Sequence, residues 1–462
     1  MNKQFVYFIC LVSALGGLLF GYDWVVIGGA EKFYELFFGI EDNAVLQGVA
    51  MSIALVGCLI GAMVMGAMAD RFGRKKLLII SAVVFLLSAV WTGIVDSFFW
   101  FLVARFIGGI GIGLASGLSP MYIAEVAPTK IRGQLVSLNQ MTIVLGILGA
   151  QIVNWAIADD IAAGISNSEV LASWNGQMGW RWMFWAEALP AVVFLILVFF
   201  IPESPRWMAS VGRDDNALAV LEKVGGTDYA HAEMTAVKKQ LEADAREAEN
   251  AGGLKELMHR RYRYVLILGV IIAFFQQWCG TNVIFNYATK IFEAAGYEIG
   301  DVLFNIVVTG IANVVFTIVA LFVVDKLGRR PLMLLGAGGL ACIYAILGTC
   351  YYMNVSGVGM IVLVVLAIGC YAMTLGPCTW VLLSEIFPTR VRGIGMAVST
   401  FMLWVGSSTL TYFFPMMNEA MGAHGAFWTY TGVCAAGFLF FWHRLPETKG
   451  VSLEELEKKL IK

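Results

Sequence analysis

The stretch Asp70–Lys75 reads DRFGRK, and it returns almost unchanged as DKLGRR at Asp325–Arg330. A second matching pair follows, EVAPTKIRG at Glu125–Gly133 and EIFPTRVRG at Glu385–Gly393. Repetition at matched positions indicates two halves derived from one unit. In membrane proteins, such halves commonly enclose a substrate site and move around it.

The composition places this chain in a membrane. Hydrophobic residues make up 59% of the sequence, charged residues only 14%, and the mean hydropathy is +0.77. A bilayer-spanning helix needs about 20 predominantly apolar residues. We predict an all-α membrane protein with twelve spans, in two pseudo-symmetric six-helix bundles. The spans are expected near residues 6–29, 47–69, 77–95, 98–122, 133–158, 182–201, 264–289, 302–324, 332–352, 357–383, 394–417 and 425–443.

Polar segments divide the chain into four predicted parts. We expect an N-terminal six-helix bundle at 1–202, a helical linker at 203–262, a C-terminal six-helix bundle at 263–446 and a short C-terminal helix at 447–462. A third echo, PESPR against PETKG, closes each bundle after its sixth span.

Within the linker and the tail, local patterns predict short solvated helices. Asn216–Val224 and Thr235–Glu249 have helical patterning with mixed charge. Ser452 followed by Glu455 is typical of a capping box that opens a charged helix.

The distribution of charge predicts the orientation. Lys and Arg gather in alternate loops, at 71–76, 130–132, 326–330 and 390–392, and the intervening loops hold few besides Lys32 and Lys290. The positive-inside rule therefore places both termini and the linker in the cytoplasm. The net charge of −2 argues against a nucleic-acid partner.

Other chemistry is not indicated. The eight cysteines show no C-x-x-C spacing and are expected to be small buried hydrophobes. Gly108–Gly113 looks like a dinucleotide loop but lacks the strand and soluble βαβ unit that such a loop needs. No nucleophile–base set or metal-ligand set is present, so we expect no enzymatic activity, cofactor or metal.

Charged residues inside the apolar spans are the strongest functional signal, because an unpaired charge in hydrocarbon costs several kcal/mol. Asp23, Arg105 and Glu187 are of this kind. Asp23 and Arg105 fall at similar depth on helices of opposite direction, so we expect them to pair. A carboxylate that is either paired or protonated is a proton switch. A static ion pair and, for Glu187, a packing role are the alternatives.

Polar and aromatic residues inside the spans form a second candidate set. Amides donate and accept hydrogen bonds without charge, which suits a neutral polyhydroxylated ligand, and aromatic rings can stack on a sugar. Each residue alone is also compatible with helix packing. The set is Phe20, Gln151, Gln276, Gln277, Asn282, Asn286, Asn313, Trp380 and Trp404, with Gly280 beside it as a point where the seventh span could loosen.

The repeated loops suggest a gate at the cytoplasmic ends of the spans. Their arginines can bond the carboxylates of the same half and helix C-termini, and so hold this side closed. Simple topogenic charge is the alternative. The candidate gate residues are Arg71, Arg74, Glu125, Arg132, Arg329, Arg330, Glu385 and Arg392.

These motifs resemble the sugar porters of the major facilitator superfamily, over about residues 6–460. The stretches that carry the resemblance are GGLLFGYD at 16–23, the D-x-x-G-R-[RK] loops, PESPR at 202–206, QQ at 276–277 with Asn282, GP at 376–377 with Trp380, and PETKG at 446–450. Within the family, the bacterial D-xylose–proton symporters are the most similar group.

The resemblance implies that sugar binds mainly to Gln276, Gln277, Asn282, Asn313 and Trp380, with Gln151 a further contact. Asp23 stands where proton-coupled members have an acid, which favours symport. Asn286-Tyr287 replaces a tyrosine pair, and Ile147 and Leu403 replace two glutamines of the xylose symporter. Glucose, galactose or arabinose therefore remain possible substrates.

We expect a monomeric, multi-pass protein of a bacterial inner membrane that imports a monosaccharide with a proton by alternating access. Two alternatives are a facilitative uniporter and a sugar sensor that does not transport.

Overall fold

The computed structural model describes residues 2–129, 131–159, 165–250, 257–297, 299–388 and 391–449. Within these ranges every regular element is a helix, as predicted. Eleven helical segments are long and apolar enough to cross a membrane. The predicted tail helix and its Ser452–Glu455 capping box lie outside the described residues.

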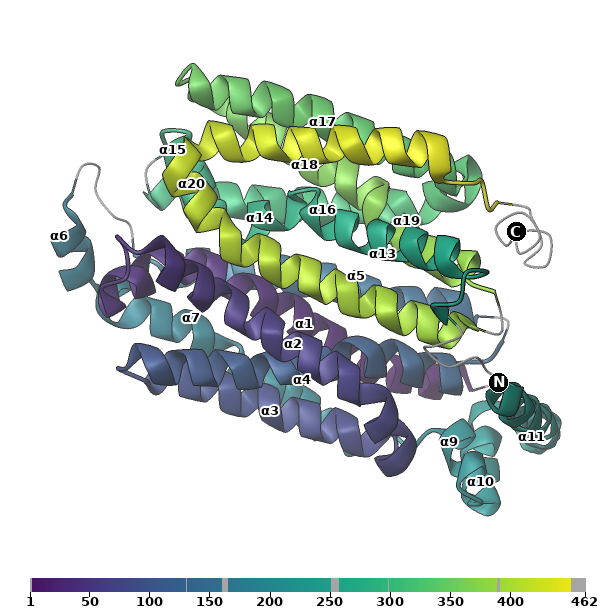
Figure 1. The fold of residues 1–462 in the computed structure, drawn as a ribbon. Coiled ribbons are helices and arrows are strands. Elements are labelled where there is room, and N and C mark those ends of the chain that lie inside the picture. The colour runs from purple at the N-terminus through teal and green to yellow at the C-terminus, as the bar shows by residue number, and fades with distance from the viewer. Residues whose placement is uncertain are drawn as a thin grey trace. The chain divides into compact units, whose positions relative to one another are not determined.

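The first half builds its spans from long helices and one interrupted helix (Figure 1). In order they are α1 (Lys3–Phe38), α2 (Ala44–Phe72), α3 (Arg74–Ile94), α4 (Phe98–Val126), α5 (Arg132–Ile157), α6 (Asn167–Ala172), η1 (Asn175–Gly179), α7 (Trp180–Ala186) and α8 (Ala188–Val198). The short α6 begins with a capping box, in which the Glu169 backbone N–H donates to Ser166 Oγ and the Ser166 backbone N–H donates to the Glu169 carboxylate. The Ser166 hydroxyl also donates to this carboxylate. These hydrogen bonds lower the pKa of Glu169.

The linker forms the predicted solvated helices. They are α9 (Pro205–Ser210), α10 (Asp214–Gly225) and α11 (Thr227–Asn250). Trp207, Leu221 and Met234 are among the side chains of their small apolar core. The Trp207 indole donates to the Asp70 carbonyl at 2.9 Å and attaches the linker to the end of α2.

The second half repeats the pattern with more interruptions. Its helices are α13 (Arg263–Trp278), α14 (Thr281–Asn286), α15 (Ala288–Ala294), α16 (Ile299–Leu327), α17 (Arg329–Tyr352), α18 (Val358–Met373), α19 (Leu375–Ile386) and α20 (Arg392–Arg444). Figure 1 shows α20 bending sharply, at Gly422, where φ is 69° and ψ is 173°. The 53 residues of α20 are thus two spans, and the described segments supply the twelve spans of the predicted fold.

Two spans of the second half are broken near their middle. Gly280 has a left-handed φ of 91° between α13 and α14, which confirms the predicted loosening. Thr374, with φ −123° and ψ −82°, separates α18 from α19. Broken helices expose backbone and side-chain polar groups, and in transporters they commonly form the substrate site.

The chain divides into two compact units that cut across the sequence halves. One unit holds 1–24, 57–150 and 184–251, and the other holds 25–56, 151–183 and 252–462. The second unit therefore includes the Phe38 end of α1, the beginning of α2 and the far end of α5 together with the second-half helices. The four-part division at 202, 262 and 446 stays a prediction.

Candidate functional site

A buried ion pair joins α1 to α4. The Arg105 guanidinium donates through Nη1 to Asp23 Oδ1, and through Nη2 to the Asp23 carbonyl at 3.2 Å. Each side chain is only 2% exposed. The Phe184 ring lies 5.3 Å from the guanidinium carbon and covers it. The predicted pairing of Asp23 with Arg105 is therefore present.

Glu187 completes this cluster. It stands between α7 and α8, is 2% exposed, and its carboxyl interacts electrostatically with both Asp23 and Arg105. Two carboxyl groups thus face one guanidinium where little water reaches. Burying a surplus charge is costly, so this arrangement favours holding one proton among the three groups.

The broken seventh span presents a chain of amides. The Asn282 amide donates to Gln277 Oε1, Gln277 Nε2 donates to Gln276 Oε1 at 2.5 Å, and Gln276 Nε2 donates to the Tyr371 hydroxyl at 2.6 Å. The break at Gly280 separates Asn282, on α14, from the two glutamines on α13. These four side chains offer an uncharged set of donors and acceptors, which can exchange partners with the hydroxyl groups of a ligand.

Sequence analysis missed Tyr371. It lies on α18 in an apolar run, where a single tyrosine is no signal for a polar site. Tyr371 lies three residues before the helix break at Thr374, and only the structure shows that break.

The other predicted contact residues are more dispersed. Asn313 is 7% exposed and Trp404 is 5% exposed, whereas Trp380 is 43% exposed. In the part of the chain that the structure describes, no hydrogen bond links Asn313 or Trp380 to the amide chain.

Two predicted contacts come from the first half of the sequence. Phe20 is partly exposed, and its ring centroid lies 5.2 Å from that of Trp24. Gln151 is 1% exposed, and neither end of its amide has a hydrogen-bond partner among the described residues. Phe20 and Gln151 belong to different compact units. A buried amide without a partner retains the capacity to bind a polar ligand.

The repeated loops build the same ion pair in each half. Arg74 Nη2 lies 2.9 Å from Glu125 Oε1, and Arg329 Nη2 lies 3.2 Å from Glu385 Oε1. Both pairings were predicted from the sequence. They tie the beginning of α3 to the end of α4, and the beginning of α17 to the end of α19.

The third echo has a structural role that the sequence did not reveal. Glu203 of PESPR accepts from the backbone N–H groups of Arg74 at 2.9 Å and Lys75 at 3.0 Å. Glu447 of PETKG accepts in the same way from Arg329 at 3.0 Å and Arg330 at 3.2 Å. A carboxylate at a helix N-terminus satisfies free N–H donors and complements the helix dipole.

The remaining gate candidates have other partners. Arg132 Nε donates to the Ala127 carbonyl at 3.4 Å, and Arg392 Nε donates to the Phe387 carbonyl at 3.2 Å. Ala127 and Phe387 are the C-cap residues of α4 and α19. The Arg330 guanidinium donates to the Trp442 carbonyl at 2.8 Å.

Arg71 does not pair as predicted. It is exposed, and its guanidinium lies over the Phe72 ring, 5.2 Å from the centroid. In the loops, the arginine after the glycine therefore forms the carboxylate pair, because it opens the next helix and points back at α4 or α19.

Comparison with known proteins places this architecture in one family. The model of the "Sugar (and other) transporter" family matches residues 9–460. The D-xylose-proton symporter of Escherichia coli is 38% identical, with 99% of this chain and 96% of the relative aligned. The arabinose-proton symporter of Bacillus subtilis is 34% identical over 100% of this chain and 96% of its own.

A solved structure is similarly close. The inward-open xylose transporter XylE of E. coli superposes with a TM-score of 0.86 at 36% identity, covering 98% of this chain and all of the other. The similarity therefore extends over the whole length of both proteins in sequence and in fold.

Proposed function

Since the chain belongs to the Sugar (and other) transporter family, we propose that it imports a monosaccharide together with a proton by alternating access. It is a multi-pass membrane protein. The proteins similar to it include proton symporters for D-xylose and arabinose. These relatives support transport rather than an enzymatic reaction.

The observation that carries the proposal is the cluster of Asp23, Arg105 and Glu187. Protonating Asp23 neutralises the partner of Arg105 and changes the attraction between α1 and α4. In our proposal, Asp23 takes up its proton from outside while the sugar is bound, and releases it inside after the sugar leaves. Arg105 drives that release by favouring the ionised carboxylate.

Sugar binding is assigned to the amide chain. Gln276, Gln277 and Asn282 hydrogen-bond one another, so a sugar hydroxyl can replace each bond without leaving a buried group unpaired. Tyr371 extends this surface. Gln151, Asn313, Trp380, Trp404 and Phe20 are proposed as further contacts.

The proposal also includes the orientation of the protein in the membrane. Arg74, Lys75, Arg329 and Arg330 lie at one end of the spans, and the positive-inside rule places that end, with both termini, in the cytoplasm. The Phe38 end of α1 then faces outward. We propose that the Arg74–Glu125 and Arg329–Glu385 pairs help to close the cytoplasmic side, and that the protein acts as a monomer.

The test is uptake into proteoliposomes with an imposed inward proton gradient. Labelled D-xylose, L-arabinose, D-glucose and D-galactose are supplied separately while internal pH is recorded. We expect one sugar to accumulate above equilibrium. Its uptake should also acidify the lumen, because a proton enters with each sugar. Equilibration without accumulation or acidification would favour a uniporter, and binding without uptake would favour a sensor.

A further inference from the structure

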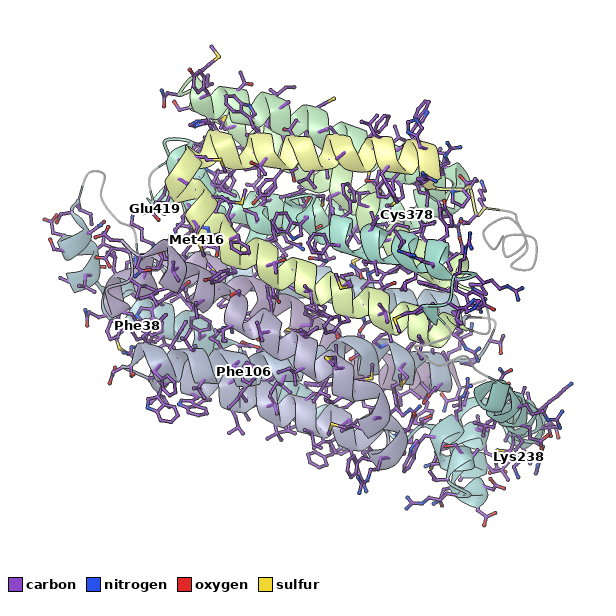
Figure 2. All side chains as sticks on the ribbon, viewed as in Figure 1. Phe38, Phe106, Lys238, Cys378, Met416 and Glu419 are labelled. Atoms are coloured by element: carbon purple, nitrogen blue, oxygen red, sulfur yellow. The ribbon has the colours of Figure 1, made fainter. Side chains whose placement is uncertain are left out.

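A second group of buried charges lies toward the end of α1 that Phe38, labelled in Figure 2, marks. The Lys290 ammonium on α15 is 3.0 Å from Glu31 Oε1, 3.0 Å from Glu35 Oε1 and 2.8 Å from Gln47 Oε1. Glu31 is 0% exposed and Glu35 is 4% exposed. One cation thus serves two buried carboxyl groups.

The same helices are held together by further contacts. Lys32 of α1 pairs with Glu293 of α15 at 2.6 Å. Here α1 supplies the cation and α15 the carboxylate, the reverse of the Lys290 pairs. The Thr289 hydroxyl donates to the Gly28 carbonyl at 2.8 Å. A Cβ at Gly28 would lie 2.7 Å from the Phe285 carbonyl oxygen, so the backbones of α1 and the adjoining α14 are in direct contact.

Gln47 connects the cluster to the α1–α2 turn. Its amide nitrogen donates to Glu35 Oε2 at 3.2 Å and to the carbonyls of Ile40 at 3.2 Å and Glu41 at 2.7 Å. A cavity of about 190 Å³ borders the group and is lined in part by Glu31, Glu35, Gln47 and Lys290. The exposed residues Glu41 and Asn167 line the same cavity, which therefore extends from the surface to the buried carboxyl groups.

The charges of this group do not balance. The titratable groups that face Glu31 are Glu35 on its own helix and Tyr287, Lys290 and Glu293 on the neighbouring segment. With Lys32 included, three carboxyl groups meet two ammonium groups, and Glu41 at the cavity edge adds no positive charge. Closure therefore leaves a surplus negative charge beside the fully buried Glu31, unless a proton is bound.

This arrangement repeats the stoichiometry of the Asp23 cluster, in which two carboxyl groups also face one cation. We propose that Glu31, Glu35 and Lys290 form a second proton-binding site, which latches α1 to α15 at the outer side when it is occupied. The proposal depends on the transport function and sidedness given above. When the latch opens, Glu31 and Glu35 are hydrated and release the proton to the outside water, so this proton is not carried across.

The latch explains how external acid could favour the step that import requires. A proton taken from outside closes the outer side, and closing must precede opening to the cytoplasm. Lys32–Glu293 adds attraction that does not depend on this proton, because its charges balance.

The experiment measures opening directly by double electron–electron resonance in nanodiscs. Nitroxide labels are placed at Asp42→Cys and Ala294→Cys, which are exposed positions outside the cluster, in a background with the native cysteines replaced. The Asp23→Asn substitution is added so that protonation of the Asp23–Arg105–Glu187 cluster contributes less to the pH dependence of the distance. No sugar is present.

We expect the short distance at acidic pH and a growing long-distance population as pH rises. For one proton, the ratio of closed to open protein should fall by about tenfold per pH unit at the steepest part. Glu31→Gln should keep the short distance at all pH values. Lys290→Gln should enlarge the long-distance population, and Lys290→Arg should reverse that change.

Glu41→Gln is the matched control, since Glu41 lines the same cavity but is exposed, and it should keep the parent's pH profile. A distance distribution that does not change with pH, or the same pH profile in Glu31→Gln as in its parent, would overturn the second proton site. Lys290→Gln without a wider distance would overturn the latch. Either result leaves the Asp23 coupling intact, because sugar accumulation is measured separately.

Discussion

The cluster around Asp23 in the first half is charged, whereas the broken seventh span in the second half carries a chain of neutral polar side chains. Asp23, Arg105 and Glu187 form an ionic cluster in one, while Gln276, Gln277 and Asn282 form an amide chain in the other. A charge cluster changes its interactions when a proton binds, and an amide chain does not. If the proposed assignments hold, separate groups bind the proton and the sugar, and the coupling between them has to pass through a conformational change.

The ends of the two halves that carry the repeated loops, by contrast, are alike. Each builds an arginine–glutamate pair and a glutamate cap on the following helix, and Gly73 and Gly328 have the same φ of 91°. Duplication thus preserved the frame of the halves, while the side chains inside the spans diverged.

The largest effect is expected from Asp23→Asn, which would remove the proton switch of the charged cluster. A proton moving down 100 mV supplies about 2.3 kcal/mol, enough for roughly 50-fold accumulation of sugar. In proteoliposomes, the substituted protein should bring sugar only to equilibrium and should not acidify the lumen. Sugar affinity by calorimetry should stay near that of the wild type, because the amides are unchanged.

Asp42→Asn is the control, since Asp42 is exposed and lies in the α1–α2 turn. It should accumulate sugar normally. Accumulation by Asp23→Asn would show that the proton binds elsewhere, with Glu187 the next residue to substitute.

A smaller effect is expected from substitutions in the amide chain of the second half, and it concerns sugar affinity. Gln276→Ala or Asn282→Ala leaves buried amide partners unsatisfied at about 1–3 kcal/mol, which weakens sugar binding roughly five- to 150-fold. Calorimetry on purified protein measures this directly. Gln134→Ala, at an exposed position, should bind like the wild type. Near wild-type affinity in both amide variants would place the sugar site elsewhere.

The features that the sequence predicted were those with strong local signals. Apolar run length located the spans, the repeated loops paired Arg74 with Glu125, and depth along two helices paired Asp23 with Arg105. Each of these depends on periodicity or on the high cost of a buried charge, which constrain a chain irrespective of its detailed packing.

The features that it did not predict depend on where broken helices direct their side chains. The partner of Gln276 is Tyr371, almost a hundred residues away on another broken span. The Glu31–Lys290 group was missed because Lys290 was seen only as an exception to the charge rule. Only the packing of α15 against α1 shows that the two residues meet.

Tyr371→Phe is expected to have a moderate effect on the amide chain. It removes the hydroxyl that accepts from Gln276 Nε2 and retains the ring. The loss of one hydrogen bond is worth about 0.5–1.5 kcal/mol, or roughly two- to 13-fold in sugar affinity. Tyr352→Phe serves as the control, because Tyr352 is 63% exposed. Equal affinity in both variants would leave Tyr371 outside the site.

The smallest effect is expected from Arg132→Gln, and it tests whether charge matters outside the buried cluster. Arg132 Nη2 is 4.0 Å from Glu233 Oε1, with side chains 40% and 25% exposed. Exposed pairs contribute about 0–1 kcal/mol and weaken in salt, so the thermal midpoint in detergent should change little and should match the wild type at high salt. Arg74→Gln is the matched comparison, because Arg74 and Glu125 are 10% and 9% exposed at 2.9 Å. Its midpoint should fall further and stay low in salt, since removing one partner leaves a poorly solvated carboxylate. Equal shifts in the two variants would mean that burial does not decide how much each of these arginines contributes to stability.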